Sequence, residues 1–152
     1  MRLSCILRYR NAHTCLFFEE DIKFKPKNKT ALRQWINETI VNEGASLSEI
    51  NYIFCSDVYL IGLNQQYLDH DTYTDIITFD NSEIEKSIAG DIFISVDRIR
   101  ENALTFGIDA THELQRVMIH GVLHLLGYKD KSKKDKALMT QKEDFYLDKV
   151  KF

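Results

Sequence analysis

Two histidines and an aspartate in the C-terminal part of the chain have the residue types and spacing of a metal site. His120 and His124 are four residues apart, so on a helix their rings project from one face and can close on one ion. Gly127 favours a helix end, and the turn after it can bring Asp130 to the roughly 2.0–2.2 Å at which a carboxylate ligates zinc. Three protein ligands leave a position for water, which is the catalytic pattern.

The surroundings of the two histidines favour a metal over a simple pair of polar side chains. Apolar residues flank both rings, namely Val117, Met118, Ile119, Val122, Leu123, Leu125 and Leu126. Buried imidazoles need polar partners, which a metal supplies. The alternative is that the backbone or glutamate side chains supply them. Gly121 costs about 1 kcal/mol relative to alanine within a helix, which indicates close approach of a strand or a substrate.

Position 121 also separates this motif from that of the His-Glu-x-x-His peptidases, because glycine stands where their general base lies. Water whose pKa is lowered towards about 7 by a metal could act as the nucleophile without that base. Glu113 lies on the same helix face as the histidines and is our candidate catalytic residue, as a proton acceptor or as a group that orients a ligand. The alternative is a solvated glutamate near a helix start, where the helix dipole favours it.

Hydrophobic periodicity predicts the elements that must position these residues. Strands are expected in 14–25 (one or two), 50–55, 75–79 and 91–95, and helices in 30–43, 58–67, 99–104, 111–126 and 133–150. Thr30 and Ser132 are predicted N-caps, Gly44 a helix end, and Gly90 the start of a strand. These elements indicate an α+β fold with a mixed sheet of about four strands packed with several helices.

The composition is that of one ordinary globular domain. The chain has 152 residues, 44% of them hydrophobic and 28% charged, with a single proline and six glycines, so we expect one domain over residues 1–152. No apolar run suits a membrane span, and the first ten residues lack the features of a secretory signal. Cys5, Cys15 and Cys55 form no Cys-x-x-Cys pair and are interpreted as reduced thiols, which predicts a cytoplasmic protein.

The net charge of −3 gives the chain no overall electrostatic attraction for nucleic acid, so any RNA contact must be local. Lysines next to the motif could attract a phosphate backbone, with Lys131, Lys133 and Lys134 as the candidates beside Lys129 and Lys136. A solvated helix start is the stronger alternative for them. His70 and His112 are interpreted as surface or packing residues, and Tyr67, Phe79 and Phe93 as core residues rather than platforms for base stacking.

The segment from His120 to Asp130 resembles the signature of the YbeY family of bacterial rRNA-maturation endoribonucleases, His-Gly-x-Leu-His-Leu-x-Gly-Tyr-Asp-His. Other blocks resemble the family in its order, and together they span roughly residues 50 to 145: Leu63-Asn64-x-x-Tyr67, Thr74 to Phe79, Gly90 to Ser95, and Met139 with Glu143.

This resemblance implies an α+β fold related to zinc peptidases, with a zincin-like metal-binding helix and one zinc ion per chain. It implies a single-strand-specific endoribonuclease that acts in rRNA maturation and ribosome quality control. Ribosomal RNA and the ribosome would be its partners, with no DNA or membrane involved.

Two positions depart from the family pattern. Asp130 stands where the family usually has histidine, and its negative charge would make the metal a weaker Lewis acid and more tolerant of manganese or iron. Leu68 stands where the family usually has an arginine suited to gripping phosphate. Arg116, which we take as a candidate substrate-binding residue, Arg98 or the lysines could fill that role, and the sequence does not choose among them.

The same residues also fit other functions. Two histidines and one carboxylate also make the facial triad of iron oxygenases, and a hydrolase of another bond fits the same ligands. A non-catalytic ribosome-assembly module, in which a metal only fastens the last helix, is the rival from another class. Turnover on RNA separates these functions.

Overall fold

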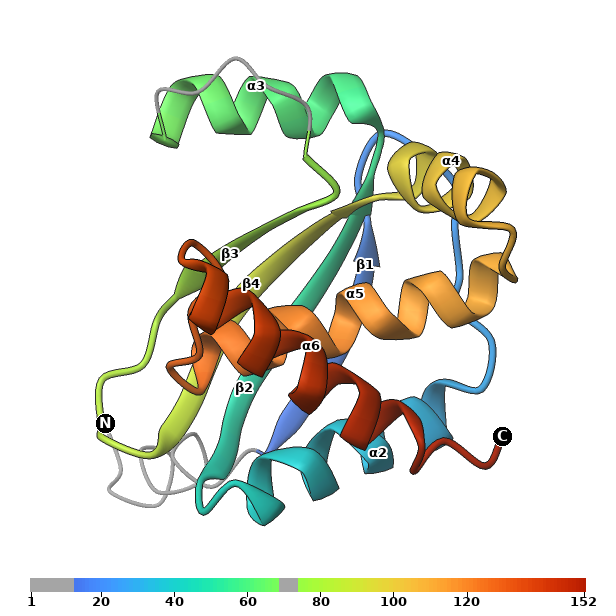
Figure 1. Ribbon diagram of the computed structural model, residues 1–152. Coiled ribbons are helices and arrows are strands. Elements are labelled where there is room, and N and C mark those ends of the chain that lie inside the picture. Colours follow the sequence, from blue (N-terminus) through green and yellow to red (C-terminus); the bar gives the residue numbers. More distant parts are fainter. Residues whose placement is uncertain (1–12, 69–73) are drawn as a thin grey trace.

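The computed structural model describes residues 13–68 and 74–152, and Figure 1 shows the arrangement of its elements. In chain order these are β1 (Thr14–Glu19), α2 (Lys29–Asn42), β2 (Ser46–Cys55), α3 (Asp57–Leu68), β3 (Ile76–Asp80), β4 (Ser87–Ser95), α4 (Val96–Phe106), α5 (Ala110–Leu125) and α6 (Lys133–Leu147). Cys5 and His70 lie outside the described residues.

The strands form a four-stranded mixed sheet within the described residues, in the order β1-β2-β4-β3. β1, β2 and β4 run parallel, whereas β3 pairs antiparallel with β4 and forms one edge. The predicted α+β fold with about four strands is therefore confirmed. Because β3 is an edge strand, only one of its sides is covered by a neighbouring strand, and its other side is free to border a site.

The main core lies between one face of the sheet and the helices α2, α5 and α6 (Figure 1). Successive side chains of a strand point to opposite faces, so Ile92 and Ile94 of β4 enter this core while Phe93 between them does not. Phe93 instead packs into a smaller cluster around Leu60 and Ile77, on the face that α3 partly covers. α5 therefore crosses the sheet on the face that forms the main core, and it contacts β3 and β4.

The helix limits differ from the prediction mainly in α4, which is longer than 99–104, and in α6, which ends at Leu147 rather than at residue 150. Ser132 caps α6 as predicted, because its hydroxyl accepts a hydrogen bond from the Asp135 N–H. Gly44 follows α2 with a φ of 82°, a left-handed conformation that glycine adopts readily. Thr30 as an N-cap is wrong, since α2 begins at Lys29 and Asn28 takes the cap position without a capping side-chain bond.

The first and last residues of the strands differ from the predicted ones. β1 ends at Glu19 rather than continuing to residue 25, because the Glu19 carboxylate accepts from the Phe24 N–H and folds the chain into bends. β2 and β4 begin earlier than predicted. Gly90 therefore lies inside β4, where a Cβ would stand 2.7 Å from the Phe79 carbonyl oxygen and 2.8 Å from a Leu125 methyl group. Glycine is needed there for close packing of β3 and α5 and not to start the strand.

Both cysteines of the described residues lie in the interior. Cys15 and Cys55 are buried free thiols, and burial raises the pKa of each to about 12, so both stay protonated and unreactive at neutral pH. Within residues 13–68 and 74–152, no helix has both the length and the hydropathy that crossing a bilayer requires.

Candidate metal centre

Backbone hydrogen bonds at the C-terminal end of α5 reverse the chain, so that it runs back towards His120 and His124. The Gly127 N–H donates to the His124 carbonyl and the Tyr128 N–H to the Leu123 carbonyl, each at 3.0 Å, which is the Schellman pattern. Gly127 has a φ of 105°, a value open to glycine at little cost. The predicted turn at Gly127 is therefore confirmed, and it brings Asp130 back beside the helix.

Three side chains converge where the chain returns. His120 Nε2 and His124 Nε2 are 2.9 Å apart, and the Asp130 Oδ2 lies 3.3 Å from the first and 3.1 Å from the second. Ligands at about 2.0–2.2 Å from a tetrahedral ion stand roughly 3.3–3.6 Å from one another, so these separations need to widen by only a few tenths of an ångström. His120, His124 and Asp130 together could hold a metal ion.

The hydrogen bonds on the far sides of the rings fit a cation at this point. The Tyr128 carbonyl oxygen lies 3.0 Å from His124 Nδ1 and can only accept, so the proton is on Nδ1 and the Nε2 lone pair faces the cluster. The Glu143 carboxylate lies 3.5 Å from His120 Nδ1 and favours the same arrangement. Two lone pairs and a carboxylate oxygen meeting at one point favour a positive ion there.

The charged groups around His120 also favour a positive charge at this point. Burial by itself lowers the pKa of His120, but the carboxylates of Glu143, Asp130 and Asp75 outweigh it and raise the pKa above its usual value. The surroundings of the ring therefore stabilise positive charge, in the form of a proton or a metal ion.

Behind His120 lies a partly buried charge network of Arg116, Glu113 and Glu143. Arg116 donates through Nη2 and Nε to the two oxygens of Glu113, at 2.5 and 3.1 Å, and through Nη1 to Glu143 Oε1 at 3.1 Å. Glu113 is fully buried, so the solvated alternative for it is wrong. The guanidinium of Arg116 is engaged by two carboxylates, which favours a positioning role over a phosphate contact.

Sequence reasoning did not assign Glu143 the place beside His120. Glu143 comes from α6 and is 4% exposed, with buried Met139 and Tyr146 on the same helix. A carboxylate that lies among the buried residues of a helix needs a polar partner. The position of Glu143 between Met139 and Tyr146 was therefore the signal in the sequence that pointed to a buried partner. The partner itself could not be identified, because it belongs to another helix.

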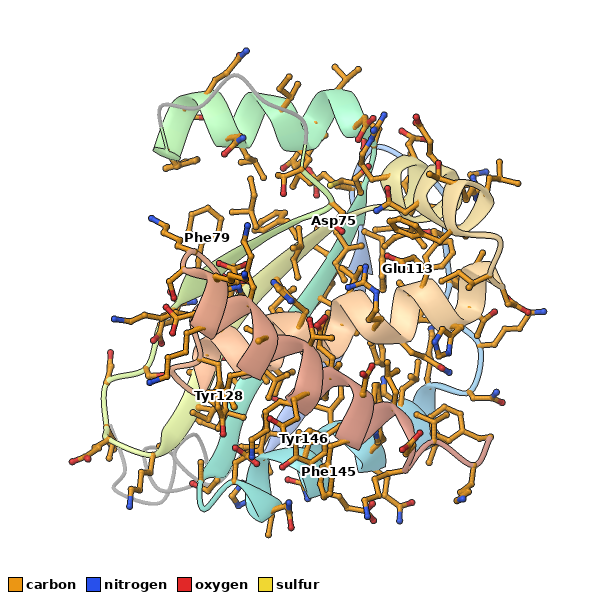
Figure 2. The ribbon with its side chains drawn as sticks, viewed as in Figure 1. Asp75, Phe79, Glu113, Tyr128, Phe145 and Tyr146 are labelled. Atoms are coloured by element: carbon orange, nitrogen blue, oxygen red, sulfur yellow. The ribbon has the colours of Figure 1, made fainter. Side chains whose placement is uncertain are left out.

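A cleft of about 470 Å³ opens beside the three ligands, between β3 and the C-terminal half of α5. The lining residues are Thr74, Asp75, Ile76, Ile77, Thr78, Asp80, His120, His124, Leu125, Asp130 and Lys131. Asp75, which also lines the cleft, is a second residue whose role could not be assigned from the sequence. Figure 2 shows it above α5. Burial raises the pKa of Asp75 above its usual value, against the opposing charges of His120 and Arg116.

The lysines, His112 and Arg98, which were named from the sequence, differ in their position relative to this cleft. Lys131 lines the cleft, whereas Lys133 and Lys134 are exposed in the first turn of α6. His112 is exposed, as predicted for a surface residue. Arg98 is paired with Asp57 and Glu101.

The aromatic residues divide into two groups. Phe79 and Phe93 are half-buried with their rings edge to face at 5.7 Å, which confirms the packing prediction for both. Tyr67 is 59% exposed with its ring against Phe79, so placing it in the core was wrong. Tyr67 lies one residue before the end of α3, and its ring meets Phe79 of β3 edge to face at 5.7 Å.

Gly121 has the close neighbours that its place in a helix predicted. A Cβ there would stand 2.9 Å from Ile76 and 3.0 Å from Ile92, both on the sheet. The close approach is therefore that of strands, and it sets α5 against β3 and β4.

Asp130→Ala is expected to weaken metal binding by about 100-fold or more, because a three-ligand site loses its only carboxylate. Asp130→His should retain the metal and shift preference towards zinc over manganese, since imidazole suits zinc and carboxylate suits harder ions. Competition titrations with both metals measure these changes. An Asp130→Ala protein that binds as tightly as the parent would move the third ligand elsewhere, with Glu143 the next to test.

Comparisons with known proteins agree on one family. A sequence profile described as endoribonuclease YbeY matches residues 17–151. A protein named endoribonuclease YbeY from Cytophaga hutchinsonii is 50% identical over 139 residues, which cover 91% of this chain and 97% of that protein. Another of that name, from Flavobacterium psychrophilum, is 53% identical over 127 residues, covering 84% of this chain and 90% of that protein.

A solved structure is similar as well. The solution structure of a protein from Thermotoga maritima superposes with a TM-score of 0.61 at 28% identity, covering 89% of this chain and 87% of that one. The structural similarity therefore extends over most of the fold, and the family match over residues 17–151 includes the segments that carry the ligand cluster.

Proposed function

Because the chain belongs to the endoribonuclease YbeY family, we propose that it is a metal-dependent endoribonuclease that hydrolyses RNA phosphodiester bonds in the cleft beside His120, His124 and Asp130. The observation that carries this proposal is the meeting of two imidazole nitrogens and a carboxylate oxygen, 2.9–3.3 Å apart, at the wall of that cleft. An ion held on one side by these three atoms has room for water and substrate on the other.

His120, His124 and Asp130 would hold one divalent ion, which we propose to be zinc. When bound, such an ion supplies Lewis acidity, lowering the pKa of a coordinated water towards about 7 and withdrawing charge from a phosphoryl oxygen. The carboxylate in the ligand set leaves room for harder divalent metals.

The protein's own groups hold the ligands in place. The Tyr128 carbonyl orients His124, and the Glu143 carboxylate faces His120 Nδ1. Arg116 fixes Glu143, and Glu113 fixes Arg116. Of the two roles considered for Glu113, we therefore propose the positioning role, because a fully buried carboxylate cannot exchange a proton directly with substrate.

Substrate contact is proposed for lysines at the cleft and beside it. Lys131 borders the cleft, and Lys133 and Lys134 follow it on an exposed helix start, so the three could lie along one phosphate backbone. A local basic patch is needed because the net charge of the chain is −3. We propose that the substrate is a single-stranded region of ribosomal RNA, cut during rRNA maturation in the cytoplasm with the ribosome as partner.

The test is cleavage of single-stranded RNA and of an rRNA precursor by the purified protein, with its metal content measured in the same preparation. Cleavage should stop with chelator and return with zinc, while a duplex RNA of the same length stays intact. Lys131→Ala, Lys133→Ala and Lys134→Ala combined should weaken RNA binding and reduce the slope of log affinity against log salt by roughly 2–3. An unchanged slope makes these lysines a solvated surface.

An active-site variant distinguishes the enzyme from its rival. His120→Ala is the matched control, and it should bind RNA normally without cutting it. A metal-loaded protein that leaves both RNAs intact would overturn the nuclease proposal. If such a protein still supports ribosome assembly, the metal fastens α6 in a non-catalytic module.

A further inference from the structure

A hydrogen-bonded cluster away from the metal ligands joins three elements that are distant in sequence. Glu43 follows the last residue of α2 and its side chain is 9% exposed. Its carboxylate accepts from the hydroxyls of Tyr128 and Tyr146, and from Lys142 Nζ at 3.2 Å. Tyr128 lies in the loop after α5, and the other two donors lie on α6. Figure 2 shows the two tyrosines on the same side of the molecule, the side of α2.

Tyr128 connects this cluster to the metal site. Its carbonyl oxygen accepts from His124 Nδ1 at 3.0 Å, and its N–H completes the Schellman turn at Leu123. Asp130 is two residues further along the same loop. Glu43 therefore holds the hydroxyl of Tyr128. The carbonyl of Tyr128 orients His124, and Asp130 follows two residues later.

This anchor is a long-range contact, because Glu43 and Tyr128 are 85 residues apart and meet only through tertiary packing. Burial tends to raise the pKa of Glu43, but the bonds from Tyr128, Tyr146 and Lys142 outweigh it and lower the pKa below its usual value. Glu43 is therefore ionised at neutral pH, and hydrogen bonds to a carboxylate are stronger than those to a neutral acceptor.

We propose that Glu43 is a positioning residue of the metal site, which holds Tyr128 so that its carbonyl orients His124 and its loop presents Asp130. This inference rests on the metal site of the proposed function and assigns that site an anchor in α2.

Tyr128→Phe tests the anchor, because it keeps the ring packed and removes only the hydroxyl. Its affinity for Zn²⁺, measured by calorimetry, should fall roughly threefold to tenfold, less than the 10–100-fold typical of losing a group that bonds a ligand directly. Bound Co²⁺ should show an altered d–d absorption spectrum, since the orientation of His124 changes. Glu43→Ala should give the same losses, and the double variant should lose no more than either single variant.

Tyr146→Phe is the matched control. It removes a hydroxyl from the same carboxylate but leaves Tyr128 bound, so it should lower the melting temperature of the metal-free protein by a few degrees without changing the affinity for Zn²⁺ or the Co²⁺ spectrum. Equal losses of affinity in the Tyr128 and Tyr146 variants would mean that the cluster acts through general stability, and would overturn the inference.

The two proposals fail in different ways. A parent protein that binds neither Zn²⁺ nor Co²⁺ removes the metal site, and the anchor falls with it. A parent that binds Zn²⁺ and cuts RNA, while Tyr128→Phe and Glu43→Ala keep full affinity and an unchanged spectrum, leaves the proposed function standing and overturns the anchor alone.

Discussion

His120→Ala and His124→Ala are each expected to abolish RNA cleavage and to lose bound metal. Each removes one of three ligand atoms that lie 2.9–3.3 Å apart, leaving two. Metal affinity should fall by more than about 100-fold, beyond the loss caused by changing a group that only supports a ligand. Cleavage should fall by about 1000-fold or more, because Lewis acidity contributes several kcal/mol to the transition state. Elemental analysis and single-turnover cleavage assays measure the two effects.

His112→Ala is the matched control for these variants, since it changes an exposed histidine of the same helix. It should retain full metal content and activity. Full metal stoichiometry in His120→Ala or His124→Ala would contradict the assignment of the site. Loss of metal with cleavage retained would instead separate the metal from the reaction.

Arg116→Met is expected to destabilise the metal-free protein by about 3 kcal/mol or more. The arginine is the cation between Glu113 and Glu143, which are 0% and 4% exposed, so its removal takes the counter-charge from Glu113 and leaves Glu143 with only His120 Nδ1 at 3.5 Å among the partners described above. For a chain of this size the melting temperature should drop by roughly 6–12 °C. Thermal unfolding with chelator present measures the change without the stabilising effect of bound metal.

Two further variants test the cause of that loss. Arg116→Lys keeps the charge but loses the planar fork that bonds both Glu113 oxygens, so its stability should be intermediate. Combining Arg116→Met with Glu113→Gln should restore part of the loss, because one uncompensated charge disappears. An Arg116→Met protein as stable as the parent would show that the two carboxylates need no cation.

The buried network explains why a metal site can persist in an apolar helix. His120 and His124 are half-buried at the edge of the core, and each ring has a polar partner behind it, in Glu143 and the Tyr128 carbonyl. Those partners fix which ring nitrogen faces the cleft before any ion arrives. The ligand atoms therefore already face the cleft, and an ion would need little reorganisation of the rings to bind there.

The sequence by itself determined the parts of this protein that depend on neighbours within a helical turn. The spacing of His120 and His124 places both rings on one face, and Gly127 reverses the chain to return Asp130 to them. The Ser132 cap and the alternation of buried side chains along β2 and β4 are local features of the same kind. Their signals lie within about four residues, because helical and extended backbones repeat over that distance.

Only the tertiary structure decided which distant groups meet. Glu143 supports His120 from another helix, and Glu43 holds Tyr128 from 85 residues away. Gly90 illustrates the same limit, because its need for a missing Cβ comes from Phe79 and Leu125 on two other elements. Such contacts depend on strand order and on how α5 crosses the sheet. They leave no periodic trace, because burial constrains each residue's polarity and size but does not specify its partner.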